Sequence, residues 1–232
     1  MVEISLPGMK KIYILGNWKS NKTMEEARDW VQNFTPDLAG KTQDITLIVC
    51  PAFHHLTLFA QHGARYALGV QDISPYESGA FTGAISAAMV KDLVTYTMIG
   101  HSERRKYFGE TDEAVSEKVK RALDAGIRPI VCVSETHQAE RLHALVPAFS
   151  ESGLILYEPL FAIGSGTSDT PEHANKAARL IHDIVPVPIL YGGSVTHENV
   201  AGFVREEYLS GVGVGGASLD PKKFQALINA VV

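Results

Sequence analysis

Short apolar runs alternate along this chain with longer segments in which apolar residues recur at helical spacing. The eight runs cover residues 12–15, 45–49, 66–70, 95–99, 129–133, 154–157, 189–191 and 212–214. Alternation of strand-like runs with helices is typical of a parallel sheet whose helices pack outside it. The pattern therefore predicts eight strand–helix units.

Helix-start signals fall in the intervals between the runs. Thr23 is followed three residues later by Glu26, and this spacing predicts a capping box at the start of the first helix. Further helices are expected over residues 54–61 and 86–92, and from Thr111, Thr170–Pro171 and Asp220–Pro221. The helix after the fifth run should be short, because Pro147 interrupts it.

The number of units matches a closed α/β barrel of eight strands. Neither a linker nor a composition shift divides residues 1–232, so we expect one domain, with residues 1–8 as an extension that is native or added. A doubly wound open sheet is the alternative fold. It is weakened because no glycine fingerprint follows the first run.

Composition narrows the functional classes. The chain is 45% hydrophobic, enough for a substantial core, and has no apolar stretch long enough to cross a membrane. A net charge of −5 and a pI near 6.0 argue against nucleic-acid or membrane-surface binding. Cys50 and Cys132 lie in apolar runs and are expected to be buried thiols in a reducing compartment. With no segment suited to a secretory signal, the expected location is the cytoplasm.

Candidate chemistry lies directly after the strands, because the loops that follow parallel barrel strands share one face. Lys19, His101 and Glu158 follow the first, fourth and sixth runs. Glycine turns at 192–194 and 215–216 follow the seventh and eighth runs, and their N–H groups suit a phosphate. We therefore expect a carboxylate, an imidazole, an ammonium group and an anion site at one mouth.

Glu158 is the residue around which this interpretation is organised. Pro159 follows it at once and should end the strand there. The small residues that come next, Ala162, Gly164, Ser165 and Gly166, suit a lid able to close over an anion. The sequence thus indicates a carboxylate base beside a closing segment.

Each candidate also has a structural interpretation. Glu158 alone would be a salt-bridged strand end, and Lys19 alone a surface charge. His101 alone would be a structural histidine, although a helix start disfavours the imidazolium and leaves a neutral ring that still donates. Cys132 is better interpreted as a buried thiol than as a nucleophile.

We expect no metal site. The nine histidines show no metal-ligand spacing. The adjacent pair His54–His55 should diverge on a helix, so these two rings are not expected to meet.

Seven motifs together resemble the triosephosphate isomerase family, in that family's order and over residues 11–232. They are GNWKSN at 16–21, GAFTG at 79–83, GHSERR at 100–105, YFGETDE at 107–113, YEPLFAIGSG at 157–166, YGGSV at 191–195 and GGASL at 215–219. Any one of them is weak, but the set is highly specific. The resemblance implies a single-domain (β/α)8 TIM barrel that interconverts dihydroxyacetone phosphate and D-glyceraldehyde 3-phosphate without a cofactor.

The resemblance also implies roles for individual residues. Glu158 would shuttle a proton between two substrate carbons, and His101 would polarise the oxygens of the enediolate. Lys19 and Asn17 would supply positive potential and a hydrogen bond, and Glu103 would support them. Ser102 would hold Glu158 while the lid is open. Backbone N–H groups would bind the phosphate at Gly164, Ser194, Gly215 and Gly216.

The partner implied by the resemblance is a second copy of the chain. The loop from Gln71 to Gly83 would insert beside the partner's active site, and Thr82 near its tip would help to position Lys19 and His101 there. A tetramer is the alternative assembly, permitted by shortened helical segments after strands five and six.

Several positions depart from the family pattern. Phe161 stands where the lid usually has Trp, residues 167–169 replace a lysine-containing hinge, and Ser134 replaces a glycine. Ala84 follows GAFTG where Glu is usual, so Arg104 is expected to lack its usual partner. None of these changes removes a catalytic group.

Two other functions compete with the isomerase. A barrel that binds sugar phosphates without turnover would have little reason to combine Glu158, His101 and Lys19. Another phosphate-binding barrel isomerase would instead act on a larger sugar phosphate. A coupled assay with glyceraldehyde 3-phosphate separates all three.

Overall fold

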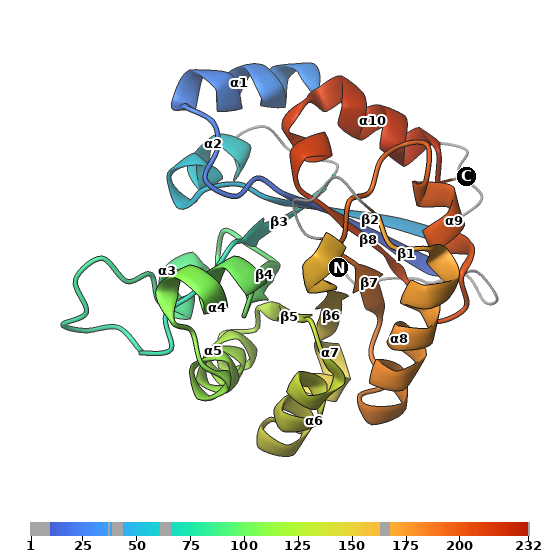
Figure 1. The fold of residues 1–232 in the computed structure, drawn as a ribbon. Coiled ribbons are helices and arrows are strands. Elements are labelled where there is room, and N and C mark those ends of the chain that lie inside the picture. Colours follow the sequence, from blue (N-terminus) through green and yellow to red (C-terminus); the bar gives the residue numbers. More distant parts are fainter. Residues whose placement is uncertain (1–9, 37, 39–43, 61–65, 163–167, 232) are drawn as a thin grey trace.

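Eight parallel strands close into a barrel in chain order (Figure 1). The computed structural model describes residues 10–231 except 37, 39–43, 61–65 and 163–167. The strands are β1 (Lys11–Asn17), β2 (Asp44–Cys50), β3 (Ala67–Val70), β4 (Tyr96–Ile99), β5 (Arg128–Val133), β6 (Leu154–Tyr157), β7 (Ile189–Tyr191) and β8 (Gly211–Val214). β8 pairs with both β7 and β1, so the sheet has no edge strand.

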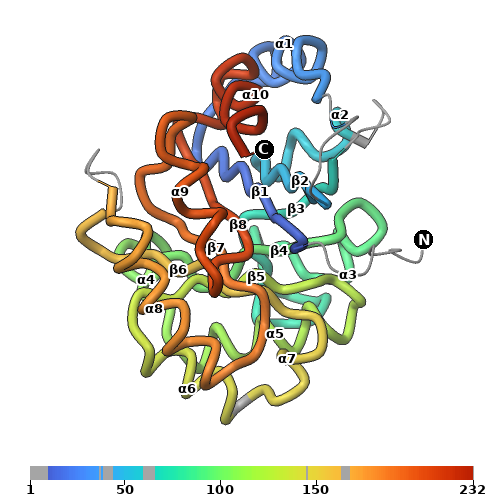
Figure 2. The backbone as a smooth tube through the Cα atoms, turned by 90° about the vertical axis from the view of Figure 1, so that its right-hand side faces the viewer, coloured from blue at the N-terminus to red at the C-terminus, as the bar shows by residue number. Residues whose placement is uncertain are grey.

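Helices surround the barrel, as the two views in Figures 1 and 2 show. They are α1 (Met24–Asn33), α2 (Leu56–Ala60), α3 (Ala87–Val90), α4 (Ser102–Phe108), α5 (Asp112–Asp124), α6 (Thr136–Leu145), α7 (Phe149–Ser152), α8 (Pro171–Ile184), α9 (Val200–Arg205) and α10 (Pro221–Asn229). Three 3-10 turns occupy Phe53–His55, Leu160–Ala162 and Gly216–Leu219. The loop between β3 and α3 projects from the body of the barrel.

Two apolar clusters explain why the strands form where they do. Alternate residues of the strands point inward and fill the barrel: Tyr13, Leu15, Ile48, Cys50, Tyr96, Met98, Ile130, Cys132, Leu154, Leu156 and Leu190. The other strand residues point outward and pack against the helices in a larger cluster. Burial on both faces is the reason why each strand appears in the sequence as a continuous apolar run.

The eight predicted strands are confirmed, each within two residues of its expected bounds. The predicted caps also form: Thr23 and Glu26 make a capping box, and the side chains of Thr111, Thr170 and Asp220 accept backbone N–H bonds. The sequence pattern missed α9 as a helix and left α4 as a turn or helix. Neither segment has a long apolar stripe, so periodicity gave no signal.

The helical segments after β5 and β6 differ from each other. After β5 the chain forms α6 and the four-residue α7, with Pro147 between them. The predicted interruption of this helix at Pro147 is therefore confirmed. After β6, however, α8 has 14 residues and is the longest helix that the structure describes. The shortening expected after strands five and six is relative to typical family members, and it stays a prediction.

The prediction that His54 and His55 diverge is wrong. Both belong to a tight 3-10 turn that precedes α2, and their ring centroids lie 3.8 Å apart. His55 is fully buried, and its ring contacts that of His54 although the two residues are adjacent in the turn.

The two cysteines are buried, as expected. Cys50 and Cys132 are both buried and free. Among the described residues no helix is long and apolar enough to span a membrane. The expected extension over residues 1–8 lies outside the described part of the chain.

Candidate active site

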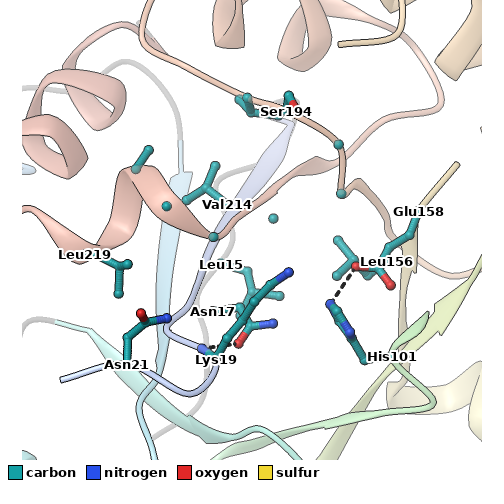
Figure 3. A pocket seen from close by; sticks show the side chains of 17 residues that line it. Leu15, Asn17, Lys19, Asn21, His101, Leu156, Glu158, Ser194, Val214 and Leu219 are labelled. Carbon is teal, nitrogen blue, oxygen red and sulfur yellow. Dashed lines mark hydrogen bonds and ion pairs between the residues drawn. The ribbon is translucent and has the colours of Figure 1, made fainter. Parts of the chain in front are cut away.

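A cavity of about 250 Å³ opens at the carboxyl ends of the strands. Its walls come from the ends of β1, β4, β6, β7 and β8, so residues far apart in sequence face one space (Figure 3). The lining includes Asn17, Lys19, His101, Glu158, Ser194, Gly215 and Gly216. The structure thus brings candidate residues from five strand ends into one cavity, whereas the candidate Glu103 is not among the lining residues and contacts one of them, Lys19, by an ion pair.

Glu158 and His101 form a buried polar pair on one side of this cavity. Glu158 Oε1 lies 3.0 Å from His101 Nε2, as the dashed line in Figure 3 marks. Glu158 is 4% exposed and His101 is 6% exposed. A carboxylate and an imidazole shielded from water at this distance are placed for proton transfer with a small substrate.

The backbone around His101 selects its tautomer. Gly100 adopts a φ of +73°, a turn that strains other residues and that directs the chain from β4 into α4. His101 then caps α4, and its Nδ1 accepts a bond from the backbone N–H of Glu103 at 3.2 Å. An Nδ1 that accepts has no proton in the neutral ring, so the proton lies on Nε2 and can be donated into the cavity.

Lys19 occupies the other side of the cavity in a constrained conformation. Its φ is +51°, and Gln71 Nε2 donates to its carbonyl oxygen at 2.9 Å. Its backbone N–H donates to Asn17 Oδ1, also at 2.9 Å, and its Nζ lies 2.6 Å from Glu103 Oε1. A left-handed backbone conformation is unfavourable for lysine. The hydrogen bonds to the Lys19 backbone stabilise this conformation and so fix the position of its side chain in the cavity.

The glycine turns let the backbone approach the polar side chains closely. A Cβ at Gly192 would lie 2.9 Å from Cγ of Glu158, so a larger residue would displace the carboxylate. At Gly215 a Cβ would lie 3.5 Å from Cε of Lys19, which shows that the lysine side chain runs along this turn. Backbone N–H groups beside an ammonium group make a natural anion site.

Some predicted residues lie elsewhere or act differently. Gly164 falls outside the described residues. Ser194 lines the cavity, and its hydroxyl donates to the carbonyl oxygen of Ala162 at 3.1 Å. Ser102 meets Glu158 through its backbone N–H, at 3.4 Å. Its hydroxyl is buried and, within the described part of the chain, has no hydrogen-bond partner.

The structure shows the surroundings of two residues that are affected by departures from the family pattern. With Ala84 in place of the usual Glu, Arg104 has other carboxylate partners: its Nε lies 2.9 Å from Asp72 and 3.2 Å from Glu110. Phe161 is 57% exposed in the turn that follows β6.

Sequence reasoning missed several lining residues. Asn21 and Leu219 line the cavity, and both belong to motifs that the sequence displayed. Gln71 was noticed only as the start of a loop, although it holds Lys19. The sequence could have indicated Gln71 as a site residue, because it directly follows a strand and therefore lies at the same end of the barrel as the other candidates.

Nothing in the described residues adds metal or thiol chemistry. No group of three or more His, Cys, Asp or Glu side chains among them could hold a metal ion. Burial raises the pKa of the Cys132 thiol well above its ordinary value, and the Glu158 carboxylate raises it further. Cys132 is therefore held as a neutral thiol beneath the site.

Comparison with known proteins gives the family. A sequence model of triosephosphate isomerase matches residues 12–231. The triosephosphate isomerases of Trichodesmium erythraeum and of a Synechocystis strain are 38% and 39% identical, each over 95% of this chain and 99% of the relative. That of a Picosynechococcus strain is 39% identical over 96% of this chain and all of the relative. A barrel of this topology, a buried Glu–His pair with a lysine opposite, and near-complete alignment agree, and the chain belongs to the triosephosphate isomerase family.

Proposed function

We propose that Glu158, His101 and Lys19 carry out the reaction of this family in the cavity described above. The protein is an isomerase that interconverts dihydroxyacetone phosphate and D-glyceraldehyde 3-phosphate. The observation that carries the proposed roles is the contact of 3.0 Å between Glu158 and His101 at the wall of that cavity.

In the proposed reaction Glu158 takes a proton from the carbon next to the substrate carbonyl. The electron pair of that C–H bond forms the carbon–carbon double bond of an enediolate, and the carbonyl oxygen takes up negative charge. Glu158 then returns the proton to the neighbouring carbon. Burial favours this step, because the carboxylate meets the substrate in a cavity from which water is largely excluded.

His101 stabilises the developing negative charge. Its Nε2–H, now directed at Glu158, would donate to the enediolate oxygens once substrate lies between the two side chains. A glutamate base with a neutral histidine is the established pairing for triosephosphate isomerases. The bond from the Glu103 N–H to Nδ1 selects the tautomer that this role requires.

The remaining polar groups bind and orient. Lys19 supplies positive potential, Asn17 fixes its backbone, and Glu103 holds its ammonium group by an ion pair. Backbone N–H groups at Ser194, Gly215 and Gly216 would hold the phosphate; Gly164, which the structure does not describe, would add another. Most of the substrate's binding energy then comes from groups other than the base.

Substitution of Glu158 by Asp tests the proposal. The change keeps the charge but withdraws the carboxylate by one methylene, on the order of 1 Å, and displacement of that size can cost about 100-fold. We expect kcat to fall by about 100-fold and KM to change little, since the phosphate contacts are untouched. Glu158→Gln should be slower still.

The exposed Glu151→Asp, on α7, makes the same chemical change away from the cavity and should leave both constants unchanged. A Glu158→Asp enzyme that works at nearly the parent rate would show that another group moves the proton.

We also propose a homodimer, with a tetramer as the alternative assembly. The projecting loop Gln71–Gly83 carries Tyr76 and Phe81, whose rings stack at 4.3 Å although they are 55% and 42% exposed. A stacked aromatic pair on an exposed loop suits burial against a second copy, and Thr82 lies beside it. Sedimentation at micromolar concentration should give a dimer, and an active monomer would contradict the proposal.

We further propose a cytoplasmic location. Two buried, unpaired cysteines are what a reducing compartment favours. Fractionation of the source cells, with antibody detection, would test this.

A further inference from the structure

A second group of charged side chains lies outside the cavity and is largely buried. Arg104 Nε lies 2.9 Å from Asp72 Oδ2 and 3.2 Å from Glu110 Oε2. Lys118 Nζ lies 2.6 Å from Asp72 Oδ1 and also contacts Glu110 Oε1. Two cations thus alternate with two carboxylates, and we call these four residues the ionic network.

The ionic network joins three separate segments. Asp72 begins the projecting loop after β3, Arg104 lies on α4, Glu110 lies between α4 and α5, and Lys118 lies on α5. The side chains of Lys118 and Glu110 are only 5% and 3% exposed. Ion pairs this well shielded are directional and are screened little by salt.

Helix α4 is held by polar contacts, among them the pair of Arg105 with Asp112 at 2.6 Å and the pair of Arg104 with Asp72 of the ionic network. It has seven residues and none of them is buried, so core packing does not fix its orientation. Yet its start carries His101, whose ring accepts from the N–H of Glu103 within α4, and Glu103 itself pairs with Lys19. Any rotation of α4 therefore moves the imidazole relative to Glu158.

Asp72 is the member of the ionic network that ties α4 to the barrel. It directly follows Gln71, whose amide holds the carbonyl oxygens of Lys19 and Cys50. Burial raises the pKa of Asp72, and only its cationic neighbours, led by Lys118, oppose that rise. Lys118 and Arg104 are therefore the neighbours that favour the charged form of Asp72.

We propose that Asp72 is a positioning residue for catalysis: through Arg104 it sets the orientation of α4 and hence the place of the His101 ring beside Glu158. This inference rests on the role of His101 proposed above. Asp72 touches no substrate, so it acts on the chemical step only through α4.

The first test is Asp72→Asn, which keeps the shape but removes the charge. We expect kcat for glyceraldehyde 3-phosphate to fall about 10-fold, because sub-ångström misplacement of a catalytic group costs that order of rate, with KM within twofold. The assay is run at 25 °C, and thermal unfolding confirms that the variant is folded there.

Two inhibitors separate positioning from a general loss of structure. The carboxylate of 2-phosphoglycolate takes the place of the enediolate oxygens beside His101, whereas inorganic phosphate meets only the anion site. In Asp72→Asn the inhibition constant of 2-phosphoglycolate should rise about as much as kcat falls, and that of phosphate should stay within twofold. Equal changes in both constants would overturn the proposal.

A matched control removes an exposed ion pair from the same region. Glu117 pairs with Lys120 on α5, and both side chains are 45% exposed. Glu117→Gln should leave kcat, KM and both inhibition constants unchanged. A kcat of Asp72→Asn within twofold of the parent would also overturn the proposal.

The chain offers a site for rescue. Ala84 lines the same hollow of about 530 Å³ as Asp72, Arg104 and Lys118, so a longer acidic side chain there could reach the cations. Asp72→Asn combined with Ala84→Glu should recover most of the lost kcat. A double variant as slow as Asp72→Asn would contradict the claim that a carboxylate in this hollow orients α4.

These outcomes are distinct from a failure of the proposed function. If Glu158→Asp or a His101→Ala variant kept the parent rate, the catalytic roles themselves would be wrong. If those variants are slow and Asp72→Asn is not, only the role of Asp72 is lost.

Discussion

Lys19 and His101 face each other across the cavity, but the protein supports them in opposite ways. Behind Lys19 lies an aromatic cluster of Trp18, Trp30, His55 and Phe59, in which the Trp18 ring is 5.0 Å from Trp30 and 5.3 Å from Phe59. Behind His101 lies the ionic network of Asp72, Arg104, Glu110 and Lys118. One support is built from apolar contact, the other from paired charges.

The two supports differ because Lys19 and His101 need different constraints. Apolar burial is strong and non-directional, so it anchors Trp18 and leaves the left-handed turn at Lys19 to be fixed by nearby hydrogen bonds. Charged pairs are directional, so they can orient α4, a helix with no buried face. The two supports should therefore respond differently to truncation, to loss of charge and to acid.

The largest effect is expected from truncating the aromatic cluster. Trp30 is 1% exposed, and its Nε1 donates to the carbonyl oxygen of Ser218 at 3.0 Å. Trp30→Ala should lower the free energy of unfolding by about 4 kcal/mol, from lost packing and a cavity. Urea unfolding at pH 7.5 measures this, with Trp30→Phe as the milder control. A loss below about 1 kcal/mol would show that this cluster is not the main anchor.

A smaller effect is expected from removing one cation of the ionic network. Lys118→Met keeps the length of the side chain but leaves Asp72 and Glu110 with Arg104 alone, which should cost about 3 kcal/mol. Without Lys118 the pKa of Asp72 rises further, so the loss is full at high pH and shrinks as acid protonates the carboxyl.

The control for this variant is Lys120→Met on the same helix, which removes an exposed pair and should cost under about 0.5 kcal/mol. Urea unfolding at pH 8 and pH 5 compares the two. Equal losses in both variants would remove the distinction between buried and exposed pairs.

The smallest expected effect is a pH dependence of the free energy of unfolding that arises from His55 in the aromatic cluster. Burial lowers the pKa of His55, and the neighbouring charges of His54 and Lys22 lower it further. Below a pH of about 6.5 the unfolded chain therefore binds a proton that the folded chain resists, so stability is full above that pH and falls below it.

His55→Phe removes this titration. Between pH 7.5 and pH 5.5 the variant should lose less stability than the parent, by under about 1 kcal/mol. The other ionisable groups are common to both proteins, so the difference isolates His55. Parallel curves for the two proteins would mean that His55 does not titrate on unfolding.

The sequence predicted the parts of the molecule that depend on local pattern. The strands followed from continuous apolar runs, and the caps at Thr23, Thr111, Thr170 and Asp220 from residue type and spacing. The meeting of Lys19, His101 and Glu158 followed from one rule, that parallel strand ends share a face.

What the sequence did not predict depends on three-dimensional contact. Asp72, Arg104, Glu110 and Lys118 carry no motif that joins them, because their pairing requires the loop, α4 and α5 to be in place. The His54 and His55 rings meet in a 3-10 turn where a helix was expected. The roles of Glu158 and His101 stay predictions until the substitutions are made.

The closure of the sheet has a consequence for synthesis. β1 is the first strand to leave the ribosome, yet its second neighbour is β8, paired from Tyr13 with Gly211 to Gly16 with Val214. Until those last residues emerge, the nascent sheet keeps two unpaired edges, and the Gly215 turn cannot reach Lys19. Enzymatic competence should therefore arrive abruptly, once β8 and the turn after it have been made, and not accumulate as successive strands are made.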